Sequence, residues 1–168
     1  RGLQGLEWAG GLPGSLGGAI RGNAGAFGGE IKDSVVSVKA IDEKGRVRVF
    51  SKKQCKFSYR SSIIKEKKSI VRSAVLGLAK GDAEELSKIA RSHIRYRKER
   101  HPLEYPNAGS MFKNCDVKKL PARWKKHFAK VMKIDPFPVI PAAAIIAEAG
   151  LKGLRSGNAQ VSQKHPNY

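Results

Sequence analysis

Glycine is concentrated in one short stretch, and this stretch limits the possible folds more than any other feature of the sequence. Nine of the twenty residues from 10 to 29 are glycine. Ordering a glycine costs more backbone entropy than ordering any other residue, so this density in a folded domain needs a purpose. A flexible linker would mix its glycines with serine and charge. Apolar side chains are interleaved here instead, so we expect the segment to be ordered: Leu12, Leu16, Ile20 and Phe27.

Composition leaves two purposes open for the glycines. Backbone amides without neighbouring side chains can approach phosphate oxygens or a flat ring closely. Tight turns and close backbone packing are an equally good explanation. The stretch is not a Walker loop, because no Gly-Lys-Ser/Thr follows it, and it lacks the preceding strand of a Rossmann fingerprint.

The rest of the chain predicts an α+β fold. Alternating polar and apolar residues indicate strands, and a 3.6-residue period with acidic first turns and basic last turns indicates helices. We expect strands at residues 34–41, 46–50, 57–60 and 70–78, and helices at residues 83–100, 119–133 and 142–149. The first two strands should form an antiparallel hairpin, and Asp82 should cap the first helix. Strands followed by helices place a domain boundary near Gly81.

The positive charge is large and uneven. The net charge of +19 divides into +2 for residues 1–50, +10 for residues 51–100 and +7 for residues 101–168. Such a balance favours anionic partners: nucleic acid, membrane headgroups or phosphorylated small molecules. The basic predicted helix carries Trp124 and Phe128, which could stack on bases, so a nucleic-acid-binding module is one alternative function.

Cysteine usage and hydropathy bear on the cellular compartment. Cys55 and Cys115 have no metal-ligand spacing and no second pair, which fits a reducing cytoplasm without a disulfide framework. No apolar run approaches the roughly 18 residues of a membrane helix. We therefore expect a cytoplasmic protein with no membrane partner and no bound metal.

Four motifs occur in a fixed order along the chain. Residues 11–31 contain Gly-Leu-Pro-Gly-Ser-Leu-Gly-Gly-Ala and Asn-Ala-Gly-Ala-Phe-Gly-Gly-Glu-Ile, and residues 57–62 read Phe-Ser-Tyr-Arg-Ser-Ser. Residues 102–114 contain Tyr-Pro-Asn-Ala-Gly-Ser-Met-Phe-Lys-Asn, and residues 148–153 and 159–167 read Glu-Ala-Gly-Leu-Lys-Gly and Ala-Gln-Val-Ser-Gln-Lys-His-Pro-Asn. Together these motifs closely resemble those of the UDP-N-acetylenolpyruvoylglucosamine reductases, the MurB family, with mild variants at Leu12, Leu16 and Phe27.

The resemblance implies a domain organisation. Residues 1–81 correspond to the C-terminal half of a PCMH-type FAD-binding domain, built of antiparallel strands with a glycine-rich loop. Residues 82–168 correspond to a truncated α/β substrate-binding domain with a basic, proline-rich insertion at about 115–141. The first half of the FAD domain and a C-terminal tail carrying a glutamate are not found, so we expect a segment of a longer protein.

The resemblance also implies an activity. Such enzymes use FAD and NADPH to reduce UDP-N-acetylglucosamine enolpyruvate to UDP-N-acetylmuramate during peptidoglycan precursor synthesis. Arg60 would meet the substrate carboxylate and steady the enolate, and Ser110 would donate a proton. The residues matching FAD contacts are Pro13, Gly14, Ser15, Gly17, Gly18 and Asn23, and those matching substrate contacts are Tyr59, Lys113, Asn114 and Glu148.

The chain departs from the family pattern in ways that bear on its activity. Cys115 replaces a common proline, and no acidic residue stands in for the tail glutamate. We expect the 168-residue chain alone to bind FAD poorly and to turn over little or nothing. A non-catalytic flavin-fold remnant is a further alternative, although Arg60 and Ser110 argue against it. No specific nucleic acid is expected, and the motifs fix no oligomeric state.

Overall fold

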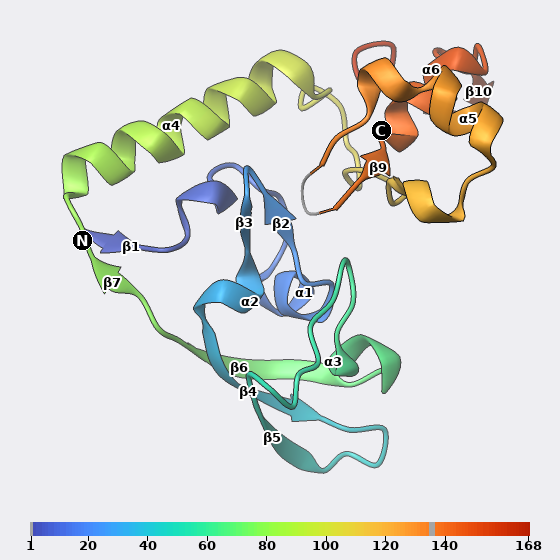
Figure 1. Ribbon diagram of the computed structural model, residues 1–168. Helices are drawn as coiled ribbons and strands as arrows, with labels where there is room; N and C mark the ends of the chain where they lie inside the picture. The colour runs from blue at the N-terminus through green and yellow to red at the C-terminus, as the bar shows by residue number, and fades with distance from the viewer. Residues whose placement is uncertain (1, 135–136) are drawn as a thin grey trace. The chain divides into compact units, whose positions relative to one another are not determined.

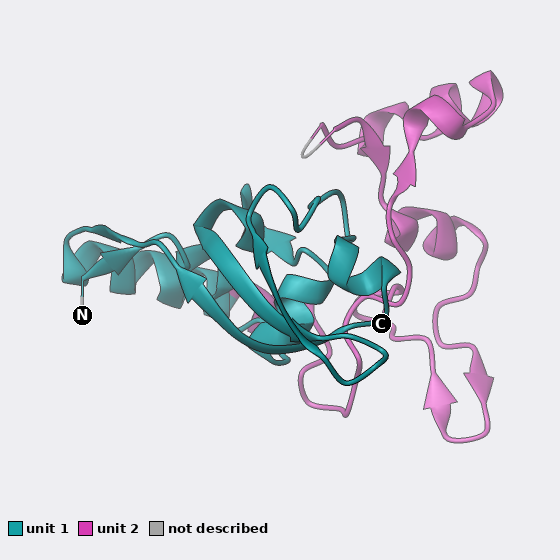
Figure 2. Ribbon diagram, turned by 90° about the horizontal axis from the view of Figure 1, so that it is seen from below, with its two compact units in different colours: residues 1–95 teal, residues 96–168 magenta. Residues whose placement is uncertain are grey.

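The computed structural model describes residues 2–134 and 137–168. The chain divides into two compact units, unit 1 (Arg1–Arg95) and unit 2 (Tyr96–Tyr168), coloured separately in Figure 2. Both combine short helices with antiparallel strands, as an α+β fold requires. The domain boundary near Gly81 stays a prediction.

Unit 1 is built around a three-stranded antiparallel sheet with the order β5-β4-β6. It consists of β4 (Val35–Ile41), β5 (Val47–Ser51) and β6 (Ile70–Leu76). The predicted hairpin is confirmed, because β4 and β5 pair from Ser37↔Ser51 to Ile41↔Val47. In β4, Val35, Val38 and Ala40 are buried, while Val36 and Lys39 are exposed. This near-alternation gives the sheet one core face.

The glycine-rich stretch is ordered, as predicted, and lies over that core face (Figure 1). It forms α1 (Leu16–Arg21) and a small hairpin of β2 (Gly25–Ala26) and β3 (Gly29–Glu30), and α2 (Ile31–Ser34) follows. The nearby elements are η1 (Glu7–Ala9) and α3 (Ile63–Glu66). The buried core comprises Trp8, Ile20, Ile31, Val35, Val38, Ala40, Cys55 and Ile64.

Two short strands and a long helix complete the path through unit 1. β1 (Leu3–Gln4) pairs with β7 (Ala79–Lys80), and α4 (Ala83–Arg100) follows at the predicted position. Asp82 caps the helix as predicted, because its Oδ1 accepts a hydrogen bond from the Glu85 amide at 2.7 Å. Within residues 2–134 and 137–168, no helix combines the length and apolar character needed to cross a membrane.

Close backbone approach holds α4 against the start of unit 1. A Cβ at Gly10 would lie 2.7 Å from the Ala90 carbonyl oxygen, so only glycine fits there. Beside this contact, the His93 ring stacks on Phe27 with centroids 3.9 Å apart, and its Nδ1 lies 2.9 Å from the Glu7 carbonyl.

Unit 2 has little regular structure. β8 (Cys115–Asp116) pairs with β9 (Val139–Ile140), and β10 (Arg155–Ser156) pairs with β11 (Ala159–Gln160). The helical elements are η2 (Val117–Lys119), α5 (Ala122–His127), η3 (Ala129–Val131) and α6 (Ala142–Glu148). The predicted third helix is confirmed as α6, and Gly150 after it has φ +70°.

Two predicted elements are wrong. The single helix at residues 119–133 is divided between η2, α5 and η3. Pro121 cannot lie inside a helix and forces extended backbone on Leu120 (φ −98°, ψ 144°), which separates η2 from α5. α5 ends separately at its C-cap Phe128, which is also the N-cap of η3. The extended piece at residues 57–60 is a tight turn, in which Ser58 and Ser61 bridge and Tyr59 and Arg60 lie between them.

Candidate active site

The start of the glycine-rich stretch presents bare backbone. Ser15 caps α1, since its Oγ accepts a hydrogen bond from the Gly18 amide at 3.1 Å. Gly14 has φ +119°, where side chains are strained, and a Cβ there would meet nothing within 4 Å. A Cβ at Gly18 would meet only Ser15 Oγ, at 3.5 Å. Since Pro13, Gly14, Ser15 and Gly18 are all exposed, a flat or phosphate-bearing cofactor can approach their main chain.

Gly17 has a different role from its neighbours. A Cβ at this position would lie 3.5 Å from the Val71 Cβ on β6. The bare side of Gly17 therefore faces the sheet and lets α1 pack on β6. Its place in a cofactor contact stays a prediction, and the packing contact gives it a structural reason of its own.

Asn23 is fully buried, and its side chain forms hydrogen bonds with other parts of unit 1. Nδ2 donates to the Ser58 carbonyl at 3.0 Å, and Oδ1 accepts from the Lys32 amide at 3.3 Å. Asn23 also has φ +42°, a conformation that asparagine tolerates better than most residues. The side chain therefore joins the glycine-rich stretch to the turn that carries Arg60. Its predicted contact with the cofactor remains a prediction.

Arg60 lies against the glycine-rich stretch. Nη2 donates to the Gly25 carbonyl at 2.7 Å, and Nη1 donates to the Asn23 carbonyl at 3.3 Å. The Lys65 ammonium donates to the Arg60 carbonyl at 3.1 Å, and the Arg60 Cζ lies 5.1 Å from the centre of the Tyr59 ring. A Cβ at Gly25 would lie 2.9 Å from the Gly29 carbonyl oxygen and 3.3 Å from Nη1, so only glycine fits between the hairpin and the guanidinium. Unit 1 thus brings Arg60 to Asn23, one of the residues predicted to hold the cofactor.

Ser110 is exposed on a loop of unit 2 that Asn167 fixes. Asn167 is only 4% exposed, and its carbonyl accepts from the Met111 amide at 2.9 Å. Its Oδ1 accepts from the Phe112 amide at 3.0 Å, and its Nδ2 donates to the Phe112 carbonyl at 2.9 Å. The motif at residues 159–167 contained this asparagine, but sequence reasoning gave it no role, since hydrogen bonds across 55 positions leave no local signal.

A group of rings lies behind Ser110. The Tyr168 hydroxyl lies 3.2 Å from Nδ1 of His101, and their rings stack with centroids 4.9 Å apart. Burial lowers the pKa of His101 to about 4, with smaller contributions from the nearby positive charges of His165, Arg97 and Lys164. Burial raises the pKa of Tyr168, against a smaller lowering from its hydrogen bond with Ser110. Both side chains are therefore neutral near pH 7.

The predicted substrate residues of unit 2 lie on exposed or half-buried surface. Lys113 is exposed, and Asn114 Oδ1 accepts from the Ala142 amide at 3.2 Å, so it also fixes the start of α6. Glu148 Oε1 lies 2.9 Å from His127 Nε2. Glu148 also borders an apolar pocket of about 360 Å³, whose other lining residues are Leu120, Trp124, Phe128, Ile145 and Ala149.

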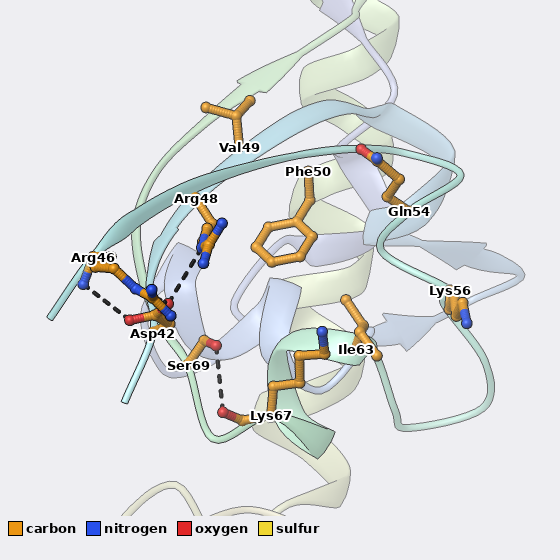
Figure 3. Close-up of a pocket in the computed structure, with 10 residues that line it drawn as sticks. All are labelled: Asp42, Arg46, Arg48, Val49, Phe50, Gln54, Lys56, Ile63, Lys67 and Ser69. Carbon is orange, nitrogen blue, oxygen red and sulfur yellow. Dashed lines mark hydrogen bonds and ion pairs between the residues drawn. The ribbon is translucent and has the colours of Figure 1, made fainter. Parts of the chain in front are cut away.

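A separate basic pocket of about 650 Å³ lies between β5 and α3 (Figure 3). Phe50 and Ile63 line it, and Asp42 Oδ2 accepts from the Nε atoms of Arg46 and Arg48, each at 3.2 Å. The pKa of Asp42 is lowered to about 2, chiefly by the hydrogen bond from the Arg46 backbone amide, with smaller help from Arg48, Lys44 and the Arg46 charge. No residue predicted for the active site lines this pocket.

Comparisons with known proteins agree with the motifs. Residues 101–168 match the profile of the UDP-N-acetylenolpyruvoylglucosamine reductase C-terminal domain, and residues 1–51 match that of an FAD binding domain. Enzymes with the same reductase name from Caldanaerobacter subterraneus and Carboxydothermus hydrogenoformans are 41% and 42% identical over 99% of the chain. The chain covers 48% of each, so it spans about half the length of these relatives.

A solved structure gives the same result. The crystal structure of UDP-N-acetylenolpyruvylglucosamine reductase from Thermus caldophilus superposes with a TM-score of 0.71 and 31% identity. The match covers 99% of this chain and 53% of that one. Family profiles, relatives and a solved structure therefore agree that the chain is similar, over 99% of its length, to the UDP-N-acetylenolpyruvoylglucosamine reductases.

Proposed function

We propose that the chain carries half of an FAD- and NADPH-dependent reductase, which converts UDP-N-acetylglucosamine enolpyruvate to UDP-N-acetylmuramate in cytoplasmic peptidoglycan precursor synthesis. The observation that carries this proposal is the guanidinium of Arg60, held by the Asn23 and Gly25 carbonyls at the glycine-rich stretch. When bound, FAD supplies the hydride that NADPH delivers.

The exposed backbone of unit 1 is the proposed place for FAD. Pro13, Gly14, Ser15 and Gly18 offer main chain that a cofactor can approach, and side chains at Gly14 or Gly18 would extend into that open space. Gly17 and Asn23 support this surface from behind, through Val71 and Ser58 respectively. The residues present therefore fit the cofactor that the family implies.

Arg60 and Ser110 are the proposed catalytic residues. Two terminal N–H groups of Arg60 are used by backbone carbonyls, and the guanidinium has further donors for a carboxylate. Contact with the enolpyruvyl carboxylate would stabilise the negative charge that develops beside it. The Ser110 hydroxyl would then donate a proton to the neighbouring carbon. Tyr59, Lys113, Asn114 and Glu148 are proposed to bind the nucleotide sugar, whose diphosphate suits the charge of Lys113.

A chimera tests the proposal, because the chain spans about half of its relatives. Residues 2–168 replace the matching segment of the Carboxydothermus hydrogenoformans enzyme, which is 42% identical. We expect a yellow protein that oxidises NADPH only when the enolpyruvyl substrate is present. Arg60→Lys should raise the KM for this substrate, since lysine cannot pair with a carboxylate through two parallel bonds.

The isolated chain serves as the comparison. We expect it to purify without a flavin absorbance band and to oxidise no NADPH. A chimera that melts cooperatively yet binds no flavin, or that oxidises NADPH at the same rate without substrate, would contradict the proposal. Nucleic-acid affinity that falls steeply with added salt would report charge alone, whereas salt-resistant, sequence-specific binding would favour the alternative function.

A further inference from the structure

We infer that Asn167 is a positioning residue for Ser110, because it fixes the backbone of the loop that carries this serine. The inference rests on the proposed function, in which Ser110 donates a proton to the substrate. It concerns how the chain holds this donor in place, and every contact it uses lies within unit 2.

The Ser110 loop lacks regular structure of its own. Residues 106–114 form no helix and no strand, and Ser110 itself is exposed. Upstream, Asn107 makes a local turn: its Nδ2 donates to the Pro102 and Tyr105 carbonyls at 3.1 and 2.9 Å, and its Oδ1 accepts from the Gly109 amide at 3.1 Å. Downstream, the loop depends on a partner far away in the sequence.

Asn167 supplies that partner through three hydrogen bonds. Its side-chain amide pairs with both the amide and the carbonyl of Phe112, at 3.0 and 2.9 Å, and its carbonyl accepts from the Met111 amide at 2.9 Å. This paired arrangement fixes both position and direction of the backbone, as neighbouring strands do in a sheet. Because Asn167 is 4% exposed, water cannot easily replace these bonds.

Tyr168 anchors the segment that carries Asn167. Its hydroxyl lies 3.2 Å from His101 Nδ1, and the two rings stack with centroids 4.9 Å apart. The Tyr168 amide donates to the His165 carbonyl, and the Tyr168 carbonyl accepts from the Ser162 amide, each at 2.9 Å. Asn167 is therefore itself held in place where it binds the loop. A proton donor must lie within about 2.6–3.2 Å of its target, and a misplacement of about 1 Å can cost a hundredfold in rate. The Ser110 loop can meet this requirement, because Asn107 fixes it upstream and Asn167 fixes it downstream.

The first test measures, in the 168-residue chain itself, how strongly Asn167 protects the loop amides from hydrogen exchange. Amide hydrogen exchange, followed by NMR, should show slow exchange at Met111 and Phe112. In Asn167→Ala we expect Phe112 to exchange at least tenfold faster. Asn167→Asp keeps the oxygen that accepts from the Phe112 amide, so its exchange should lie between the two. Asn158→Ala, at an exposed asparagine of the same unit, should leave both amides unchanged.

The second test uses the chimera and separates positioning from stability. NADPH bleaches the flavin absorbance without help from Ser110, whereas the return of absorbance on adding the enolpyruvyl substrate needs the proton donor. We expect Asn167→Ala to bleach within about twofold of the wild type and to regain colour at least tenfold more slowly. Asn167→Asp should recover part of the loss.

The outcomes distinguish this inference from the proposed function. If Phe112 stays protected in Asn167→Ala, Asn167 does not hold the loop, and the inference is wrong. If bleaching and colour return slow equally, Asn167 has only a structural role, and the inference is also wrong. If the wild-type chimera folds but consumes no substrate, the proposed function fails and the inference fails with it. If the wild-type chimera consumes substrate and Asn167→Ala regains its flavin absorbance at the same rate, only the inference is wrong.

Discussion

Asn23 offers the sharpest test of how unit 1 is held together. Asn23→Ala removes two hydrogen bonds, leaving the Ser58 carbonyl and the Lys32 amide without this partner. The half-buried Lys32 amide loses its partner, which costs about 1 kcal/mol, the lower end of the range for an unsatisfied group. The Ser58 carbonyl keeps the Ser61 amide as a donor at 3.1 Å, so its loss is about 1 kcal/mol, the net contribution of one hydrogen bond. Alanine at φ +42° adds about 1 kcal/mol of backbone strain. The expected loss in the free energy of unfolding is therefore about 3 kcal/mol.

Asn23→Gly is the matched control for this loss. Glycine adopts the same backbone conformation without strain, but like alanine it can bond neither Ser58 nor Lys32. Its stability should therefore lie between those of the wild type and Asn23→Ala. The difference between the two variants isolates the strain.

Urea unfolding followed by tryptophan fluorescence makes the measurement. The chain has two tryptophans, of which Trp8 is buried in the core of unit 1 and Trp124 lies in unit 2, so a Trp124→Phe background reports unit 1 alone. With a slope of about 2 kcal/mol per molar urea, 3 kcal/mol lowers the midpoint by about 1.5 M. A loss below about 0.5 kcal/mol in Asn23→Ala would refute the reasoning.

Three further predictions concern other sites. Gly29→Ala would place a Cβ 2.4 Å from Trp8 Cδ1, so urea unfolding should show unit 1 destabilised by about 1–3 kcal/mol. Gly18→Ala should leave the unfolding midpoint unchanged or raised, because alanine favours a helix, yet a chimera carrying it should bind less flavin by absorbance. His101 stays neutral when folded, with a pKa of about 4, but gains a proton below about pH 6.5 when unfolded. The stability of unit 2 should therefore fall as pH drops from about 6.5 to about 4. This loss should shrink in His101→Gln, and the remainder comes from His165, whose pKa burial also lowers.

The sequence was most informative where a pattern is local. The helix at residues 83–100 has its cap, its first-turn acids and its last-turn bases within the segment itself, and the structure places α4 there. The hairpin around residues 42–45 is equally local, because Asp42 accepts from the Lys44 and Arg46 amides within its own turn.

Prediction failed where one residue overrides a periodic pattern or where contacts span the sequence. Apolar spacing favoured one helix over residues 119–133, but the geometry that Pro121 imposes divided it. The Asn23–Ser58 and Asn167–Phe112 bonds join positions 35 and 55 residues apart, and no local pattern reports such pairs. Gly17 and Gly18 look alike in the sequence, and only the fold shows that one faces β6 and the other solvent.

The most direct test of the account is a crystal structure of the flavin-loaded chimera with a bound enolpyruvyl substrate. The account predicts that the Arg60 guanidinium pairs with the substrate carboxylate while the Ser110 hydroxyl contacts the adjoining carbon of the same molecule. A structure in which only one of these side chains reaches the substrate, or in which the glycine-rich stretch lies away from the flavin, would contradict it.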